Sequence, residues 1–226
     1  MFRSNLKRVQ LLAAIIPAAV SVLVVTWKLN SLVEESRTRD CKAKFFEVAF
    51  ALHKYNEKHG HLPPAVVYKD GVAMHSWRVL ILEFTAPDLF SQYRMSEPWN
   101  SPHNSRLAGK MPRMFYCTSM ATNLSEGQTI YVAAVGPDTV LRTDAEQPRR
   151  LEDTPQDAIM LIELPDGPRN WMEPADVSPA EIENYFRVRN SKSPGHEHYA
   201  TADGRVRPIF ELNIAQLADH LTVPGE

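Results

Sequence analysis

The first feature of the sequence is an apolar run near its start. From Val9 to Trp27, nineteen residues carry no charge. As a helix rising 1.5 Å per residue they would extend about 28 Å, close to the hydrocarbon thickness of a bilayer. A buried core helix would show a polar face, and a cleaved signal peptide would have a shorter apolar region before small residues. We therefore predict an uncleaved membrane helix over residues 9–29.

The charges around this run predict its orientation. Arg3, Lys7 and Arg8 precede it, whereas Lys28 is the basic residue that follows closely. Basic residues concentrate on the cytoplasmic side of membrane helices. We therefore expect a cytoplasmic N-terminus over residues 1–8, an extracytoplasmic domain over residues 30–226, and the lipid bilayer as the first partner.

Beyond residue 30 the pattern becomes that of an amphipathic helix. Apolar side chains recur with spacings of three and four at Cys41, Phe45, Val48, Leu52 and Tyr55, which is typical of a helix with one buried face. Gly60 suits the left-handed position after a helix, and Pro63-Pro64 prevents its resumption. The pattern predicts a stalk helix over about residues 31–59.

The remaining 60–226 region alternates short apolar runs with turn residues, which is typical of strands. The predicted strands are Met114–Cys117, Thr129–Val135, Ala158–Leu164, Tyr199–Ala202 and Arg205–Phe210. Asp203-Gly204 predicts a hairpin turn between the last two, and Pro208 predicts an edge strand.

This region also contains residues that are typical of helix starts. Ser76 and Pro87-Asp88 can each begin a short helix, although residues 77–84 would also fit a strand. Ser178-Pro179-Ala180-Glu181 is a capping box, and Asn213 with Gln216 resembles another. A long helix followed by an antiparallel sheet, long loops and late short helices predicts an α+β fold.

Composition narrows the function classes. The chain has 226 residues, 44% hydrophobic and 23% charged, so it can bury a substantial core. Its net charge is −2, yet the first thirty residues hold four of the 25 basic residues and no acid. The rest is therefore acidic, which argues against a nucleic-acid partner.

Histidine supplies the candidate metal ligands. His59 and His61 form one His-x-His pair, and His196 and His198 form another. Imidazoles that converge with a carboxylate could hold zinc. The alternative is that the first pair complements the end of a helix and that the second lies on one face of a strand. We favour these structural roles and expect no bound metal.

Tryptophan supplies the candidate ligand-binding residues. Trp77, Trp99 and Trp171 could line a sugar-binding groove. Buried aromatic anchors for long loops are the alternative, and the one we favour. The sequence contains no phosphate-binding glycine loop, no serine-hydrolase elbow and no zinc-type cysteine cluster. We therefore expect neither an enzyme nor a cofactor.

A single apolar helix that continues as an amphipathic stalk before an antiparallel sheet looks like the architecture of type IV pilins and pseudopilins. More narrowly, the chain resembles the bacterial prepilin-like family of unknown function DUF1559. The segments that carry this resemblance occur in the family's order: Cys41, Leu52-His53, Tyr55, Gly60, Leu62–Ala65, Ser76–Val79, Glu97–Asn104, Met111-Pro112, Cys117, Tyr131–Ala133, Val135–Pro137, Ile159–Glu163, Trp171, Glu173-Pro174 and Ala202–Gly204.

The chain departs from that family at both ends. Prepilins are cut after a glycine and carry an acid nearby, whereas this chain has no glycine before Gly60 and no acid before Glu34. The family's tail histidine is replaced by Ser193, with His196 and His198 near it. The chain is thus identified as a divergent member that lacks the peptidase start.

The resemblance implies three further expectations. Cys41 and Cys117 match family positions, which favours a disulfide between them over two buried free thiols. The location implied is the bacterial cytoplasmic (inner) membrane, with the main domain in the periplasm. The function implied is a structural or interaction role, with the same chain or other pilin-like envelope proteins as partners. An anchored glycan or metal receptor is the alternative.

Overall fold

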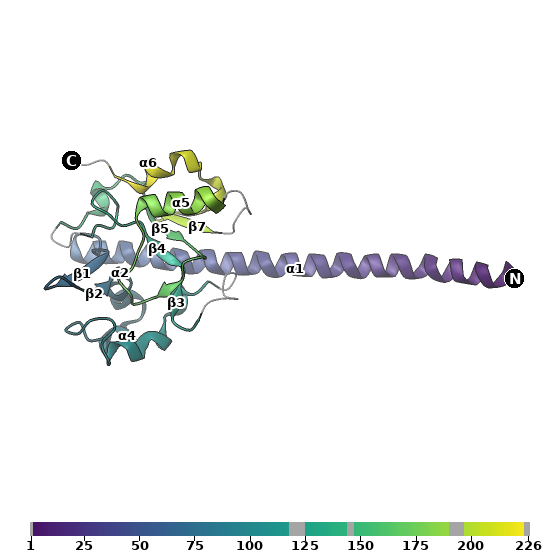
Figure 1. Ribbon diagram of the computed structural model, residues 1–226, viewed down its shortest axis with the longest axis horizontal. Coiled ribbons are helices and arrows are strands. Elements are labelled where there is room, and N and C mark those ends of the chain that lie inside the picture. Colours follow the sequence, from purple (N-terminus) through teal and green to yellow (C-terminus); the bar gives the residue numbers. More distant parts are fainter. Residues whose placement is uncertain (1, 118–124, 144–146, 190–196, 224–226) are drawn as a thin grey trace. The chain divides into compact units, whose positions relative to one another are not determined.

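The computed structural model describes residues 2–117, 125–143, 147–189 and 197–223, with side chains from residue 20 onward except those of residues 189 and 214 (Figure 1). Contacts divide the chain into two compact units, Met1–Arg39 and Asp40–Glu226. This division falls further along the chain than residue 29, where we expected the membrane helix to end. The second unit contains the candidate sites.

Helix α1 runs from Phe2 to His59 and enters both units. It ends as the sequence predicts, because Gly60 adopts the left-handed conformation with φ of 77° and donates its backbone N–H to the Asn56 carbonyl at 2.8 Å. In the second unit its buried face includes Phe45, Val48 and Leu52. The amphipathic spacing is therefore confirmed.

An antiparallel hairpin follows α1, formed by β1 (Val66–Lys69) and β2 (Val72–Ser76). Asp70 and Gly71 form its turn with φ of 52° and 75°. The sequence analysis missed this hairpin, although an Asp-Gly pair between alternating residues is a hairpin signal.

Residues 77–92 are helical: α2 is Trp77–Leu80, α3 is Leu82–Thr85 and α4 is Pro87–Gln92. Pro87 begins α4 as predicted. Ser76 precedes α2 but makes no capping hydrogen bond. Instead, its hydroxyl lies 3.5 Å from the Trp171 carbonyl.

The main sheet has four antiparallel strands in the order β4-β5-β7-β8. These are Tyr131–Ala133, Ile159–Glu163, His198–Thr201 and Val206–Pro208. Pro208 lies on the edge strand β8, and Gly204 has a φ of 77° in the turn before it, as expected. A smaller antiparallel pair joins β3 (Gln128–Thr129) to β6 (Arg169–Asn170). The α+β prediction is confirmed.

The strand predicted over Met114–Cys117 is wrong, and the one predicted over Arg205–Phe210 is wrong in part. Residues 113–115 form a 3₁₀ helix, because Pro112 accepts a hydrogen bond from the Phe115 N–H at 3.0 Å and the consecutive residues Met114 and Phe115 are both buried. The final strand ends at Pro208, where a 3₁₀ helix begins. The described 3₁₀ helices are Asn104–Lys110, Arg113–Phe115, Leu151–Asp153, Ile209–Glu211 and Ile214–Gln216.

Helices cover both faces of the main sheet (Figure 1). The α1 face packs the buried residues of α1 against Tyr131, Ala133, Leu161 and Ala200. The opposite face packs α5 (Pro179–Arg189) and α6 (Leu217–Leu221) against Val132, Ile162 and Tyr199. A register shift between Ile159 and Leu161 allows both Met160 and Leu161 to join the α1 face.

Two of the predicted helix starts and stops are visible in detail. The Ser178 hydroxyl accepts the Glu181 N–H at 3.3 Å, while the Glu181 carboxylate accepts the Ser178 N–H at 2.8 Å, which is a reciprocal capping box. Asn213 places its amide 3.3 Å from the Gln216 side chain before α6. The Ser178 box therefore marks the start of α5 as predicted, whereas Asn213 accepts the Ala215 N–H of the 3₁₀ helix Ile214–Gln216 and α6 begins without a side-chain cap hydrogen bond.

Candidate functional site

The histidine pairs occupy different environments. The His59 and His61 rings lie 6.3 Å apart at the end of α1, where His59 Nε2 contacts Glu83 Oε1 at 2.6 Å. His198 lies buried on β7 with its Nδ1 3.0 Å from Glu163 Oε2, and His196 lies outside the described residues. Within the described ranges, no three His, Cys, Asp or Glu side chains gather into a set that could hold a metal ion.

Burial accounts for two of the tryptophans. Trp77 and Trp171 are both fully buried. Their indole N–H groups donate to Asp176 Oδ2 at 3.1 Å and to the Ala108 carbonyl at 3.0 Å. Trp99 is partly buried against the same core, and its backbone N–H donates to the Met74 carbonyl at 2.8 Å. Trp77 on α2 and Trp171 are thus buried anchors within the core, and Trp99 packs against that core from its loop.

A buried ion pair lies beside Trp77. Arg78 Nη2 lies 2.6 Å from Asp176 Oδ1, and both side chains are 0% exposed. Arg78 also donates to the Tyr131 carbonyl at 2.7 Å, while Asp176 accepts the Ala133 N–H at 2.7 Å. The pair thus satisfies backbone groups of β4. The sequence analysis did not single out Arg78 or Asp176 as a pair, since 98 residues separate them.

The disulfide is formed as the resemblance implied. Cys41 on α1 is bonded to Cys117, which follows the 3₁₀ helix at residues 113–115, with 4.8 Å between their Cα atoms. Both residues are 1% exposed. The bond therefore links α1 covalently to the segment that follows the 3₁₀ helix at residues 113–115.

A polar groove of about 480 Å³ opens beside the Asp203-Gly204 turn. His53 lies in its wall, and burial lowers the pKa of this imidazole against the opposing effect of the Ala202 carbonyl. Gly204 is required here, because a side chain would meet His53 Nε2 at 3.3 Å in a left-handed backbone conformation. Asp203 accepts hydrogen bonds from Thr201 and from the Arg205 N–H. Arg205 Nη1 also lies 3.2 Å from Asp203 Oδ2, so these two charges of the groove pair with each other.

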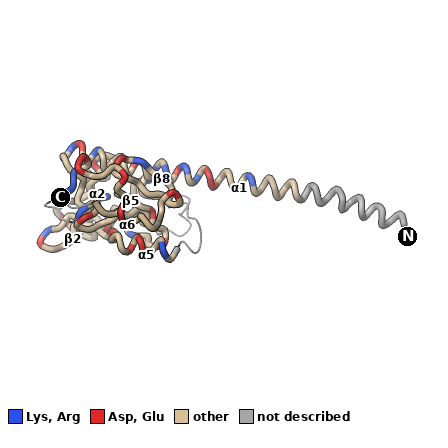
Figure 2. Tube along the Cα trace, turned by 90° about the horizontal axis from the view of Figure 1, so that it is seen from above, with Lys and Arg blue, Asp and Glu red and all other residues tan. Residues whose placement is uncertain are grey.

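A second groove of about 450 Å³ lies next to α1. Its lining includes Lys44, Arg113, Tyr116 and Glu126. Lys44 contacts Asp40 at 2.6 Å, so its charge is already paired. Basic and acidic residues also alternate along the described trace of the second unit (Figure 2).

The exposed side of α1 carries two aromatic residues in the second unit. Phe46 and Phe50 are 51% and 52% exposed and stack with ring centroids 6.3 Å apart. Lys54 lies over the Phe50 ring at 5.6 Å. This exposed aromatic pair therefore forms a stacked apolar surface on the side of α1 opposite its buried face.

The first unit has an apolar surface of its own. Nine large apolar side chains between Val20 and Val33 are at least 44% exposed, among them Leu23 at 67% and Trp27 at 69%. Of the nineteen uncharged residues from Val9 to Trp27, the side chains of residues 9–19 lie outside the described part of the structure. Among the described residues, no helix is long and apolar enough to span a bilayer.

The family described as protein of unknown function (DUF1559) matches residues 33–161, which is more than half of the chain. No curated protein and no solved structure matches the chain. The matched region contains Cys41, Cys117, Arg78 and Tyr131. The chain belongs to the DUF1559 family.

Proposed function

We propose that this DUF1559 protein is a single-pass, membrane-anchored component of the bacterial envelope with a pilin-like architecture and a structural or interaction role. The observation that carries the proposal is the exposed Phe46–Phe50 pair on α1. In this proposal the pair contacts another copy of the chain or another pilin-like protein, and the domain from residue 30 onward lies outside the cytoplasm.

The chemistry of α1 supports an association role. Its buried face holds Phe45, Val48 and Leu52, each 0% exposed, so the fold itself does not need Phe46 or Phe50. Aromatic residues dominate the energetics of protein interfaces, because they bury a large area at a small entropy cost. The exposed side of α1 that carries Phe46 and Phe50 therefore has the composition of a helix-packing surface.

The charge-free run supports the anchor. Nineteen uncharged residues from Val9 to Trp27, preceded by Arg3, Lys7 and Arg8, fit a helix whose N-terminus stays in the cytoplasm. The disulfide supports an extracytoplasmic domain, since such bonds persist in oxidising compartments. Trp77 and Trp171 are buried, so they do not line an exposed sugar-binding groove. This burial argues against the alternative function, a glycan receptor.

Site-specific photocrosslinking in cells that make the full-length protein tests this proposal. A photoreactive phenylalanine analogue replaces Phe46 or Phe50, and Tyr68 on β1, which is 51% exposed, provides the matched control. We expect adducts with the same chain or with pilin-like envelope proteins from the two α1 positions and not from Tyr68. With the analogue placed at the exposed Ala43 of α1 instead, the double variant Phe46→Ser/Phe50→Ser should give about tenfold fewer adducts than the same probe beside native Phe46 and Phe50, because two aromatic anchors are lost.

Two results would contradict the proposal. One is an adduct yield at Tyr68 equal to that at Phe46 and Phe50. The other is release of the protein from the membrane fraction by alkaline carbonate, because a helix that spans the bilayer resists this extraction. An alkaline phosphatase fused after Glu226 checks the topology and should be active.

A further inference from the structure

Three polar side chains form a row across the α1 face of the main sheet. Tyr131 on β4 is paired in register with Glu163 on β5, and His198 lies on the next strand, β7. Tyr131 and Glu163 are 0% exposed and His198 is 3% exposed. These titratable groups are buried beneath α1, so they are not part of the proposed association surface around Phe46 and Phe50.

The hydrogen bonds within the row are uneven. Glu163 Oε2 accepts the backbone N–H of His198 at 2.7 Å and also lies 3.0 Å from His198 Nδ1. Glu163 Oε1 and the Tyr131 hydroxyl are buried, and neither has a hydrogen-bond partner among the described residues. An ionised carboxylate satisfied at one oxygen is costly to keep away from water.

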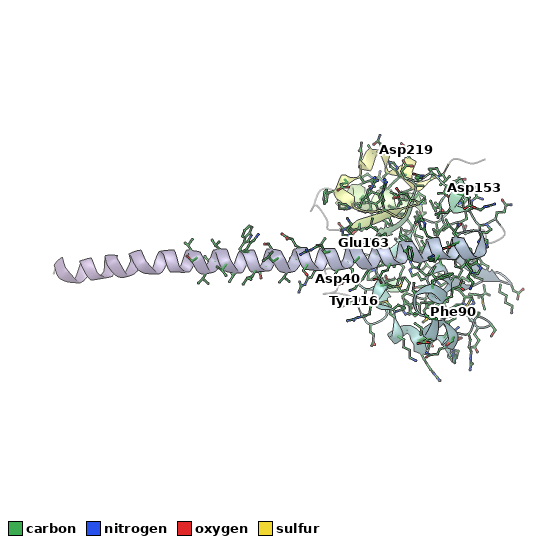
Figure 3. All side chains as sticks on the ribbon, turned by 180° about the vertical axis from the view of Figure 1, so that it is seen from behind. Asp40, Phe90, Tyr116, Asp153, Glu163 and Asp219 are labelled. Atoms are coloured by element: carbon green, nitrogen blue, oxygen red, sulfur yellow. A yellow bond between two sulfur atoms is a disulfide. The ribbon has the colours of Figure 1, made fainter. Side chains whose placement is uncertain are left out.

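Helix α1 closes this row off from solvent. The Phe45 ring packs on Tyr131 with 4.7 Å between ring centroids. Asp40 and Glu47 of α1 both act electrostatically on Tyr131, and Asp40 and Glu163 are labelled in Figure 3, toward the same end of the second unit. Water can therefore reach Glu163 more easily when this part of α1 moves.

The surrounding charges do not compensate a carboxylate at Glu163. The facing groups are Tyr131 on β4, Glu197 and His198 beside and on β7, and Asp40 and Glu47 on α1. His198 is the member of this set that can become positive, whereas Lys44 contacts Asp40. The contact with His198 Nδ1 at 3.0 Å is therefore the side-chain interaction in this set that stabilises a negative Glu163.

Burial raises the pKa of Glu163 above its ordinary value of 4.5, and the contacts of His198 only partly oppose this shift. A raised folded-state pKa means that the folded protein holds the proton more tightly than the unfolded chain. This contribution to stability is complete below about pH 4.5 and is lost as the pH rises through the folded pKa.

We propose that the row of Tyr131, Glu163 and His198 is a pH-sensitive latch between α1 and the main sheet. A proton on the Glu163–His198 pair keeps the row compatible with burial, so residues 44–52 of α1 stay packed. Loss of this proton leaves a bare carboxylate, and α1 loosens locally to admit water. The Cys41–Cys117 disulfide limits the movement, since it keeps α1 tethered next to the row. The latch does not depend on the association role.

Hydrogen exchange of the full-length protein in detergent micelles tests the latch. Protection factors for the amides of residues 44–52 are measured between about pH 5 and pH 8, corrected for intrinsic exchange. In the parent protein we expect protection to fall about tenfold over this range. Glu163→Gln should reduce the fall to less than about twofold, because the side chain no longer ionises.

Two further variants keep the test decisive. Glu57→Gln makes the same chemical change on α1 at a side chain that is 69% exposed, and it should retain the parental profile. His198→Gln removes the ring that contacts Glu163 Oε2 at 3.0 Å and should give lower protection than the parent. A pH-independent parent, equal profiles for the parent and Glu163→Gln, or a flattened profile for Glu57→Gln would each overturn the proposal.

Discussion

The two faces of the main sheet are stabilised differently. The face under α5 and α6 is built from apolar side chains such as Ile162, Ile182, Phe186 and Leu217. The α1 face combines an apolar core with a disulfide and with the buried row that contains Glu163. The Arg78–Asp176 ion pair lies at β4, next to Trp77 of this same core.

This difference predicts which solution conditions affect the stability of each face. Apolar packing depends weakly on pH and on redox state, because no charge or covalent bond changes. A buried carboxylate responds to pH, because it can gain or lose a proton. A disulfide responds to the redox state, because it can be reduced. We therefore expect the α1 face to change with its chemical environment while the α5–α6 face stays constant.

The largest expected effect comes from breaking the buried ion pair. Asp176→Ala leaves Arg78 as an uncompensated buried charge and removes the acceptor for the Ala133 N–H. We expect a loss of about 3 to 5 kcal/mol in the free energy of unfolding. Urea denaturation of the full-length protein in micelles measures this loss.

The surface pair Arg94–Glu97 provides the control for that variant. Its two side chains are 56% and 33% exposed, so water already screens the attraction. Arg94→Ala removes this pair but keeps the Ser101–Glu97 hydrogen bond, and it should leave the urea midpoint nearly unchanged. If both variants cost the same free energy, the α1 face does not owe its stability to the buried pair.

The second effect comes from the disulfide. Cys41 and Cys117 are separated by 76 residues, so their bond removes considerable entropy from the unfolded chain. The variant Cys41→Ser/Cys117→Ser should lose about 2 to 4 kcal/mol. The parent can also be reduced under denaturing conditions and then refolded. Its urea denaturation midpoint should then equal the lower midpoint of the double variant. An unchanged midpoint in the variant would show that packing alone holds α1 in place.

The smallest effect is expected on the α5–α6 face. Ile182→Val removes one methylene from a side chain that is 0% exposed, and it should cost about 1 kcal/mol. The cost should be the same at acidic and neutral pH, because the neighbours of Ile182 in this core are apolar. Denaturation curves at about pH 5 and pH 8 check this expectation. A pH-dependent cost would remove the contrast between the two faces.

Sequence reasoning found part of the candidate chemistry. His198 was selected as half of a His-x-His pair, yet its partner in the fold is Glu163, which lies 35 residues earlier. Trp77 and Trp171 were recognised as prominent, but their burial depends on Asp176 and Ala108, which come from distant loops. Distant pairing of this kind leaves no periodic trace in one sequence.

The Phe46–Phe50 surface could have been predicted more directly. Both residues fall between the buried positions Phe45, Val48 and Leu52, so the three-four spacing already places them off the buried face. The Asp70-Gly71 hairpin carried an equally clear local signal. Each of these features is local, and local patterns are what a sequence displays.

The sequence by itself determined the α+β class, the end of α1 at Gly60, the edge position of Pro208 and the cap at Ser178, because backbone geometry and neighbouring side chains decide them. Tertiary structure alone decided which charges become buried together. The pairing of Arg78 with Asp176 and of Glu163 with His198 requires strands and loops far apart in the chain to meet in a region without water. The free energy of a buried charge depends on that whole environment, and no single residue type encodes it.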